Sequence, residues 1–328
     1  MTTTPLTPRP APAPAPTPAD RALRALAIAA CVPYMGLKAA WIAGSRVGIP
    51  EGSVLLERPG VMAVANSVTL LMDAALVVLA LLLTQRWGLR VRAALLVFPM
   101  WVATGLLLPI VVGYPVDTVV GLATGGEGPV TTGPPETFLD PWVFTVVYGG
   151  FILQALALGT LFVRYAGKRW SRVWRGTVGD LSPAVSGTVL RVTAAVASLA
   201  VLLLAGLQLA WALGLAGGPG STTDGTGGTL NVQEALRPLY AMTAVAGVLS
   251  LAFRRGRSLP VALPLGFAWA GAGAVACWGG WILLAAMTPA AGSGMEPPAL
   301  LLLAYAGEMI TGTVLAGCVA VFLRRRAA

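Results

Sequence analysis

The 328-residue sequence contains no histidine. Histidine ligates haem and many metal ions, and it is the usual base beside a nucleophilic serine. Its absence excludes histidine-ligated haem, histidine-based metal sites and Ser-His dyads. It also argues against histidine-dependent lipid phosphatases, O-acyltransferases and rhomboid-type proteases. We therefore expect no cofactor and no metal ion, and the sequence leans away from an enzyme.

Other expected motifs are also missing. There is no Walker A sequence, which argues against an ATPase, and no Asp-rich repeat of the kind intramembrane prenyltransferases use to hold magnesium diphosphate. The three cysteines, Cys31, Cys277 and Cys318, lie inside apolar segments, so the sequence contains no extracellular disulfide framework.

Charge is scarce. Charged residues make up 11% of the chain, whereas a soluble domain carries roughly 25%. Hydrophobic residues make up 56%, and the mean hydropathy is +0.79. The net charge of +9 comes from basic residues that flank apolar runs, so we do not interpret it as nucleic-acid binding. The expected partner is the lipid bilayer.

Eight apolar runs are long enough to cross a bilayer, which takes about 20 residues. They are 25–44, 61–83, 93–112, 141–163, 192–215, 238–253, 261–287 and 298–323. The sixth run is short, and we expect its helix to begin earlier, near Thr229. The sequence therefore predicts an all-α, polytopic membrane helix bundle.

The basic residues predict its orientation. Most of them fall in alternate connections, where they retain the cytoplasmic side. The opposite connections hold only Arg46, Arg58 and Arg237, and three of them, 113–140, 216–228 and 288–297, contain acidic but no basic residues and are expected to be solvated loops. Both termini are thus predicted to be cytoplasmic. Abundant Arg, Ala, Gly and Pro suggest a high-GC genome, and we expect a multi-pass protein of the bacterial cytoplasmic membrane.

The chain also shows a weak internal repeat. GLKAAWIAG at 36–44 resembles GLQLAWALG at 206–214, and Tyr148-Gly149-Gly150 resembles Tyr305-Ala306-Gly307 in the same order. A four-plus-four parallel duplication explains the order, and chance similarity between apolar helices is the alternative. We expect a disordered Pro-rich tail at 1–20, a first half at 21–175 and a second half at 176–328.

Three charged residues sit well inside predicted spans. Polar or aromatic residues accompany each at helical spacing, which makes a stripe on one helix face. These candidate substrate-binding residues are Tyr34, Lys38 and Trp41; Asn66, Thr69 and Asp73; and Tyr305, Glu308 and Thr311. The candidate acids for catalysis are Asp73 and Glu308.

Depth along the helices suggests how the three charges meet. Lys38 lies roughly 9 Å from the outer end of its span, Glu308 roughly 15 Å and Asp73 roughly 18 Å. We expect Lys38 to reach one of the two acids. Glu308 is favoured because its depth is nearer, which leaves Asp73 to hold a proton. There are two alternatives to a functional site. Lys38 and an acid could form a purely structural ion pair, or Lys38 could extend to the membrane surface.

Three further features have plain structural explanations. Glu234 and Arg237, at the mouth of the sixth span, are interpreted as a surface salt bridge, with a gate as the alternative. Trp41, Trp142, Trp211 and Trp281 near span ends are interpreted as an interfacial belt. The small residues of 268–280, such as Ala270 and Ala274, are interpreted as helix packing.

Three classes of function fit these features. The leading hypothesis is a permease or permease-like protein with a polar site between the halves, in the outer half of the membrane. An intramembrane enzyme that uses Asp73 or Glu308 as a general acid, for instance on an isoprenoid-like substrate, is the second. A non-catalytic accessory or immunity-type membrane protein is the third. A small-molecule or lipid-like substrate is compatible with the first two, and the sequence leaves the oligomeric state open.

Overall fold

A computed structural model describes residues 16–56, 59–124, 139–213, 215, 232–287 and 298–327. This part of the chain is helical and contains no strand, and eight helical segments are long and apolar enough to cross a membrane. They are α1 (Pro18–Ile42), α2 (Pro59–Thr84), α3 (Ala93–Thr124), α4 (Pro141–Arg169), α6 (Thr188–Ala212), α7 (Val232–Phe253), the continuous run α8 (Ala262–Gly273), η6 (Ala274–Trp278) and α9 (Gly279–Met287), and α10 (Ala299–Ala327). The predicted all-α bundle with eight spans is confirmed.

Long apolar side chains cover the outside of this bundle. Val64 is 65% exposed and Leu71 70% exposed on α2, and comparable valines and leucines face outward on the other spans. In water such a surface would be unfavourable, whereas lipid tails are as apolar as the side chains themselves. The chain is therefore a multi-pass membrane protein.

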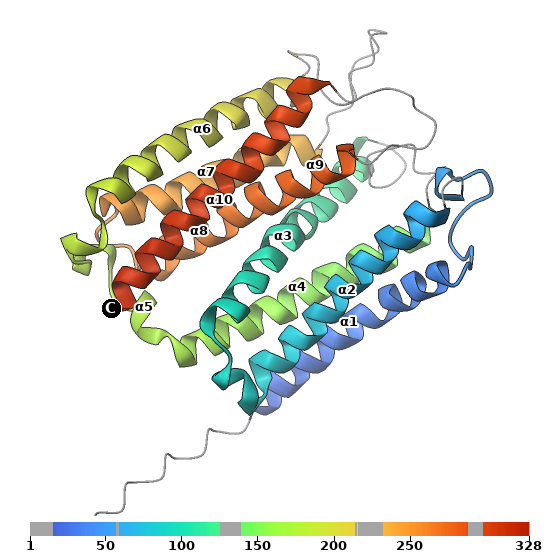
Figure 1. Ribbon diagram of the computed structural model, residues 1–328, viewed down its shortest axis with the longest axis horizontal. Helices are drawn as coiled ribbons and strands as arrows, with labels where there is room; N and C mark the ends of the chain where they lie inside the picture. The colour runs from blue at the N-terminus through green and yellow to red at the C-terminus, as the bar shows by residue number, and fades with distance from the viewer. Residues whose placement is uncertain are drawn as a thin grey trace, which may run out of the picture.

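The helices form two groups, which we call the first half (α1 to α4) and the second half (α6 to α10). In the first half α1 packs against both α2 and α4, and in the second half α6 packs against both α7 and α10. Helix α3 is the member of the first half that faces the second half, with α4 on one side and α7, α8 and η6 on the other (Figure 1). The first and last described helix ends lie at the same end of the bundle (Figure 1).

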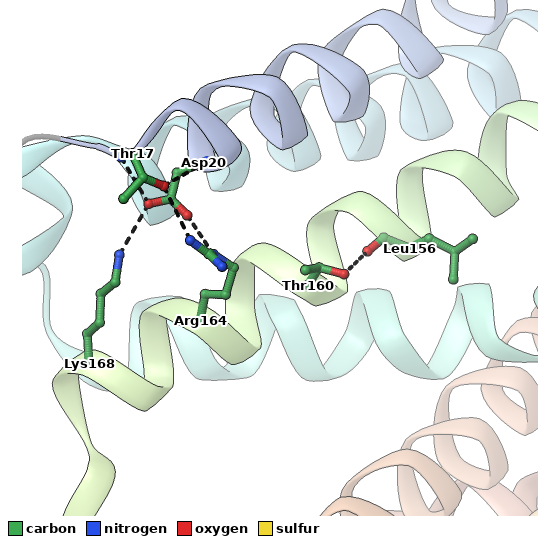
Figure 2. A network of polar contacts seen from close by, with 6 residues as sticks. All are labelled: Thr17, Asp20, Leu156, Thr160, Arg164 and Lys168. Atoms are coloured by element: carbon green, nitrogen blue, oxygen red, sulfur yellow. Dashed lines mark hydrogen bonds and ion pairs between the residues drawn. The ribbon is translucent and has the colours of Figure 1, made fainter.

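Short connections close that end of the bundle. They include the 3-10 turns η2 (Arg86–Arg90), η4 (Val178–Asp180) and η5 (Pro183–Val185) and the four-residue α5 (Ser171–Trp174). The start of α1 is held there by an ion cluster. Asp20 binds Arg164 at 2.7 Å and Lys168 at 3.2 Å and forms a capping box with Thr17 (Figure 2). Another 3-10 turn, η1 (Val54–Leu56), lies in the connection after α1 at the opposite end.

One of the two helix boundaries that the sequence left open differs from the prediction. Helix α3 continues to Thr124, so the expected loop at 113–140 is wrong for 113–124. Pro115 lies inside the helix, where it removes only one backbone donor and is tolerated in a membrane helix. Helix α7 begins before Pro238, as expected, but Thr229 lies outside the described residues.

Small residues allow the helices to cross closely. A methyl group at Gly271 of α8 would overlap backbone atoms of Ala244 on α7, and one at Gly247 of α7 would overlap Ala268. Between the halves, Gly105 of α3 lies directly against the backbone of Gly273. The packing role of segment 268–280 is thus confirmed, and Gly271 and Gly273 of this segment make close contacts with neighbouring helices.

Candidate functional site

The first half contains one buried ion pair. Lys38 on α1 is 2% exposed, and its Nζ lies 2.7 Å from Oδ2 of Asp73 on α2. The same ammonium lies 3.5 Å above the ring centre of Tyr34. The expectation that Lys38 reaches an acid is confirmed, but the preference for Glu308 is wrong. Helix α1 packs against α2 and α4 in the first half, whereas Glu308 belongs to α10 in the second half.

The other candidate residues on α1 and α2 include Trp41, Asn66 and Thr69, and their polar side chains form hydrogen bonds to nearby backbone carbonyl groups. Asn66 and Thr69 donate to carbonyl groups of their own helix, those of Met62 and Ala65, at 2.9 Å each. Trp41 is buried, and its indole donates to the carbonyl of Val47 at 2.8 Å. They were predicted to surround a ligand, and in the structure their polar groups already have bonding partners.

One polar contact near this pair was not predicted from the sequence. The amide of Gln154 on α4 lies 2.7 Å from Sγ of Cys31 on α1, and both residues are buried. Neither carries a charge, so neither was selected by a search for intramembrane charges.

The second half contains a larger cluster. Arg237 on α7 forms an ion pair with Glu308 on α10, and its Nε lies 3.1 Å from Oε2 of Glu234 one helical turn earlier. The Arg237 guanidinium lies 4.9 Å from the ring centre of Tyr305, and Gln208 of α6 donates to Oε1 of Glu308 at 3.2 Å. All five side chains are buried. We call them the Arg237 cluster.

The interpretation of Glu234 and Arg237 as a surface pair is therefore wrong. They are 7% and 6% exposed because α7 is enclosed by α3, α6, α8 and α10. Gln208 was not selected either, although the repeat contains a signal for it. The segment GLQLAW places Gln208 at the position that Lys38 occupies in GLKAAW.

The Arg237 cluster contains one cation and two acids. If both acids were ionised it would have a net charge of −1 inside the membrane, where one unpaired charge costs at least about 2.5–3.5 kcal/mol. A bound proton or another cation removes that cost. The Lys38–Asp73 pair, by contrast, is neutral without any addition.

Polar atoms without partners accompany the cluster. Gln208 is fully buried, and its Oε1 accepts no hydrogen bond from any described residue. Its orientation is set because only the amide NH₂ can donate to a carboxylate. Trp211, three residues along the same helix, is buried with an indole N–H that lacks an acceptor among the described residues.

Irregular backbone surrounds Glu308. The π-helical segment η6 packs against α10, with Gly312 against the backbone of Ala276. A methyl group at Gly279, directly after η6, would overlap the Cβ of Glu308 and lie tightly against the backbone of Met309 and Tyr305. π-Helical turns are rare and occur often at functional sites.

The predicted convergence of three charges is not observed, because the charges form two clusters, one in each half. Thr311, which completes the third stripe, donates to the carbonyl of Gly307 at 2.7 Å. It also lines an open groove of about 360 Å³ between α6 and α10. A second, much smaller void lies among apolar side chains of the second half. Neither is lined by a charged residue.

The fold and these clusters define a polytopic α-helical membrane protein with a balanced charge pair in one half and an unbalanced cluster in the other. Comparisons with protein families, curated proteins and solved structures find no match to the chain. Its function must therefore be argued from the site itself.

Proposed function

We propose that the chain is a permease-like protein of the bacterial cytoplasmic membrane, with both termini cytoplasmic, in which Glu308 takes up and releases a proton. The observation that carries this proposal is the charge imbalance of the Arg237 cluster. Arg237 contacts two buried carboxylates, Glu234 and Glu308, so the cluster is neutral only when it holds one further positive charge.

Hydrogen bonding supports Glu308 as the acid that changes state. Ionised Glu308 accepts from Gln208 and from Arg237. Protonated Glu308 could instead donate to Gln208 after the amide has turned over, which would satisfy Oε1. The fully buried Gln208 would thus rearrange when Glu308 gains a proton.

The proposal is tested by proton movement in vesicles. The purified full-length chain is reconstituted into liposomes that contain a trapped pH-sensitive dye, and a potassium diffusion potential drives protons inward. Wild-type protein should acidify the interior faster than protein-free liposomes do. Glu308→Gln should lower that rate to the protein-free level, while Asp73→Glu, a conservative change in the neutral pair, should retain it. Equal rates for wild-type and protein-free liposomes would reject the proposal.

A non-catalytic accessory protein is the second candidate, favoured by the close glycine-mediated packing around η6 and by pockets lined without charged residues. In that case the Arg237 cluster only holds α6, α7 and α10 together. Its signature would be a loss of stability in Glu308→Gln with no proton movement in the wild type.

A further inference from the structure

Tyrosine rings, carboxylates and cations occur together twice in this bundle. In the first half, Lys38 lies over Tyr34 and binds Asp73. In the second half, Arg237 lies over Tyr305 and binds Glu308. In both cases a positive group contacts the negative face of an aromatic ring and a carboxylate at once, which strengthens binding where water is excluded.

A third tyrosine–carboxylate group lies at the junction of the two halves. The rings of Tyr114 on α3 and Tyr148 on α4 are 5.0 Å apart. Asp117 lies one helical turn beyond Tyr114 on α3, on the same face of that helix. The rings of Phe144 and Phe151 extend the aromatic surface, at 6.1 Å and 6.5 Å from that of Tyr148. We call Tyr114, Asp117 and Tyr148 the junction site.

The junction site lacks an internal cation. Asp117 forms no ion pair with any residue that the structure describes. Within the same residues, no lysine or arginine lies over Tyr114 or Tyr148. Tyr148 differs in this respect from Tyr305, its counterpart in the weak repeat. The guanidinium of Arg237 lies over the ring of Tyr305.

The neighbouring helix holds Asp117 in place without neutralising it. Gln233 of α7 donates to Oδ2 of Asp117 at 3.3 Å. This contact across the two halves depends on Gly113, because a side chain at that position would overlap the Gln233 amide. An amide orients a carboxylate but does not balance its charge.

The junction site is also partly exposed. Tyr114, Asp117 and Tyr148 are each only partly buried. Tyr114 and Asp117 lie in the last third of α3 and Tyr148 lies in the first third of α4, so all three lie toward the end of the bundle opposite the connections η2 and α5.

We propose that Tyr114, Asp117 and Tyr148 bind an organic monovalent cation of the quaternary ammonium class. The aromatic faces and the carboxylate supply the same contacts that Lys38 and Arg237 use within the chain. Quaternary ammonium groups have no donors to satisfy and are recognised mainly by ring faces and charge. This binding does not depend on whether Glu308 carries protons.

Calorimetric titration with choline tests the site. The full-length chain is purified in dodecyl maltoside, whose uncharged headgroup offers no competing ammonium group. Choline should bind, and the isostere with carbon in place of nitrogen should bind at least about tenfold more weakly. Equal affinity for the two compounds would overturn the proposal.

Matched variants separate the contributions of charge and ring. Asp117→Asn should weaken choline binding at least about tenfold, and Asp117→Glu should restore part of it. Tyr148→Phe keeps the ring and should retain binding, whereas Tyr148→Leu should lose it. If Tyr148→Leu fails to fold, as judged by gel filtration, Tyr114→Leu and Tyr114→Phe provide the same comparison. Unchanged affinity in Asp117→Asn would overturn the proposal.

The Glu308→Gln variant distinguishes this proposal from the permease proposal. It should bind choline with wild-type affinity even if it moves no protons. Choline binding without proton movement would reject only the role of Glu308, and proton movement without choline binding would reject only the junction site.

Discussion

The two halves neutralise their buried charges in different ways. The first half pairs one cation, Lys38, with one acid, Asp73. The second half places Arg237 between two acids, Glu234 and Glu308, and adds the fully buried Gln208. A neutral pair is sufficient to hold two helices together, whereas an unbalanced cluster requires a further positive charge. This difference is the basis of our proposal that protonation takes place in the second half.

The strongest test of this contrast is removal of Arg237. Arg237→Met leaves two buried acids without a cation, and we expect a loss of about 3–5 kcal/mol in unfolding free energy. The free energy is measured by SDS titration in mixed micelles. The double variant Arg237→Met/Glu308→Leu should recover part of the loss, because it removes both members of one pair. A wild-type stability for Arg237→Met would contradict the cluster.

A double-mutant cycle sharpens the contrast by testing the pair in the first half. Lys38→Met and Asp73→Asn should each destabilise the protein, because each leaves a buried charge unpaired. Their combination should show a coupling energy of about 0.5–3 kcal/mol. The control cycle, Lys38→Met with Glu308→Gln, should be additive because the two side chains lie in different halves. Coupling in the control cycle would restore the pairing that depth alone suggested.

The stability cost of replacing a glycine by alanine should depend on whether that glycine contacts a neighbouring helix. Gly271→Ala places a methyl group against the backbone of α7 and should cost about 1–3 kcal/mol. Gly206 on α6 and Gly36 on α1 have no heavy atom within 4 Å of the added methyl group. Alanine at either control position should be neutral or stabilise the helix by up to about 1 kcal/mol. Apparent melting temperatures of the three variants provide the measurement.

The smallest expected effect compares two tryptophans that match in the weak repeat. Trp41→Phe removes a hydrogen bond to the carbonyl of Val47 and should cost about 1 kcal/mol. Trp211→Phe removes an indole N–H that has no partner among the described residues, so its cost should be smaller. A larger loss at Trp211, measured by the same SDS titration, would show that a water molecule or ligand binds there.

The pairing also changes what Asp73→Asn is expected to do. A proton-holding Asp73 would tolerate the substitution without loss of folding. In the structure Asp73 is the partner of Lys38, so the substitution leaves a buried ammonium unpaired. We therefore propose that Glu308, whose surroundings contain the excess acid, holds the proton instead of Asp73.

The eight spans could be predicted from the sequence because the bilayer acts on each segment separately. Every span must satisfy its own backbone hydrogen bonds and present about 20 apolar residues, whichever helices lie beside it. The candidate charges Lys38, Asp73 and Glu308 could be found for the same reason, since a charge in an apolar run is visible without any neighbour. The helical end of α3 was missed because Pro115 and the glycines near it are typical of loops in water.

Only the tertiary structure decided which charges meet. Sequence position gives the depth of a residue along its helix, and by depth Glu308 was the nearer partner of Lys38. The direction in which a side chain points, and the helix that it faces, depend on how all eight spans pack. Because α1 packs on α2, Lys38 binds Asp73, and because α7 packs on α6 and α10, Arg237 and Gln208 meet at Glu308.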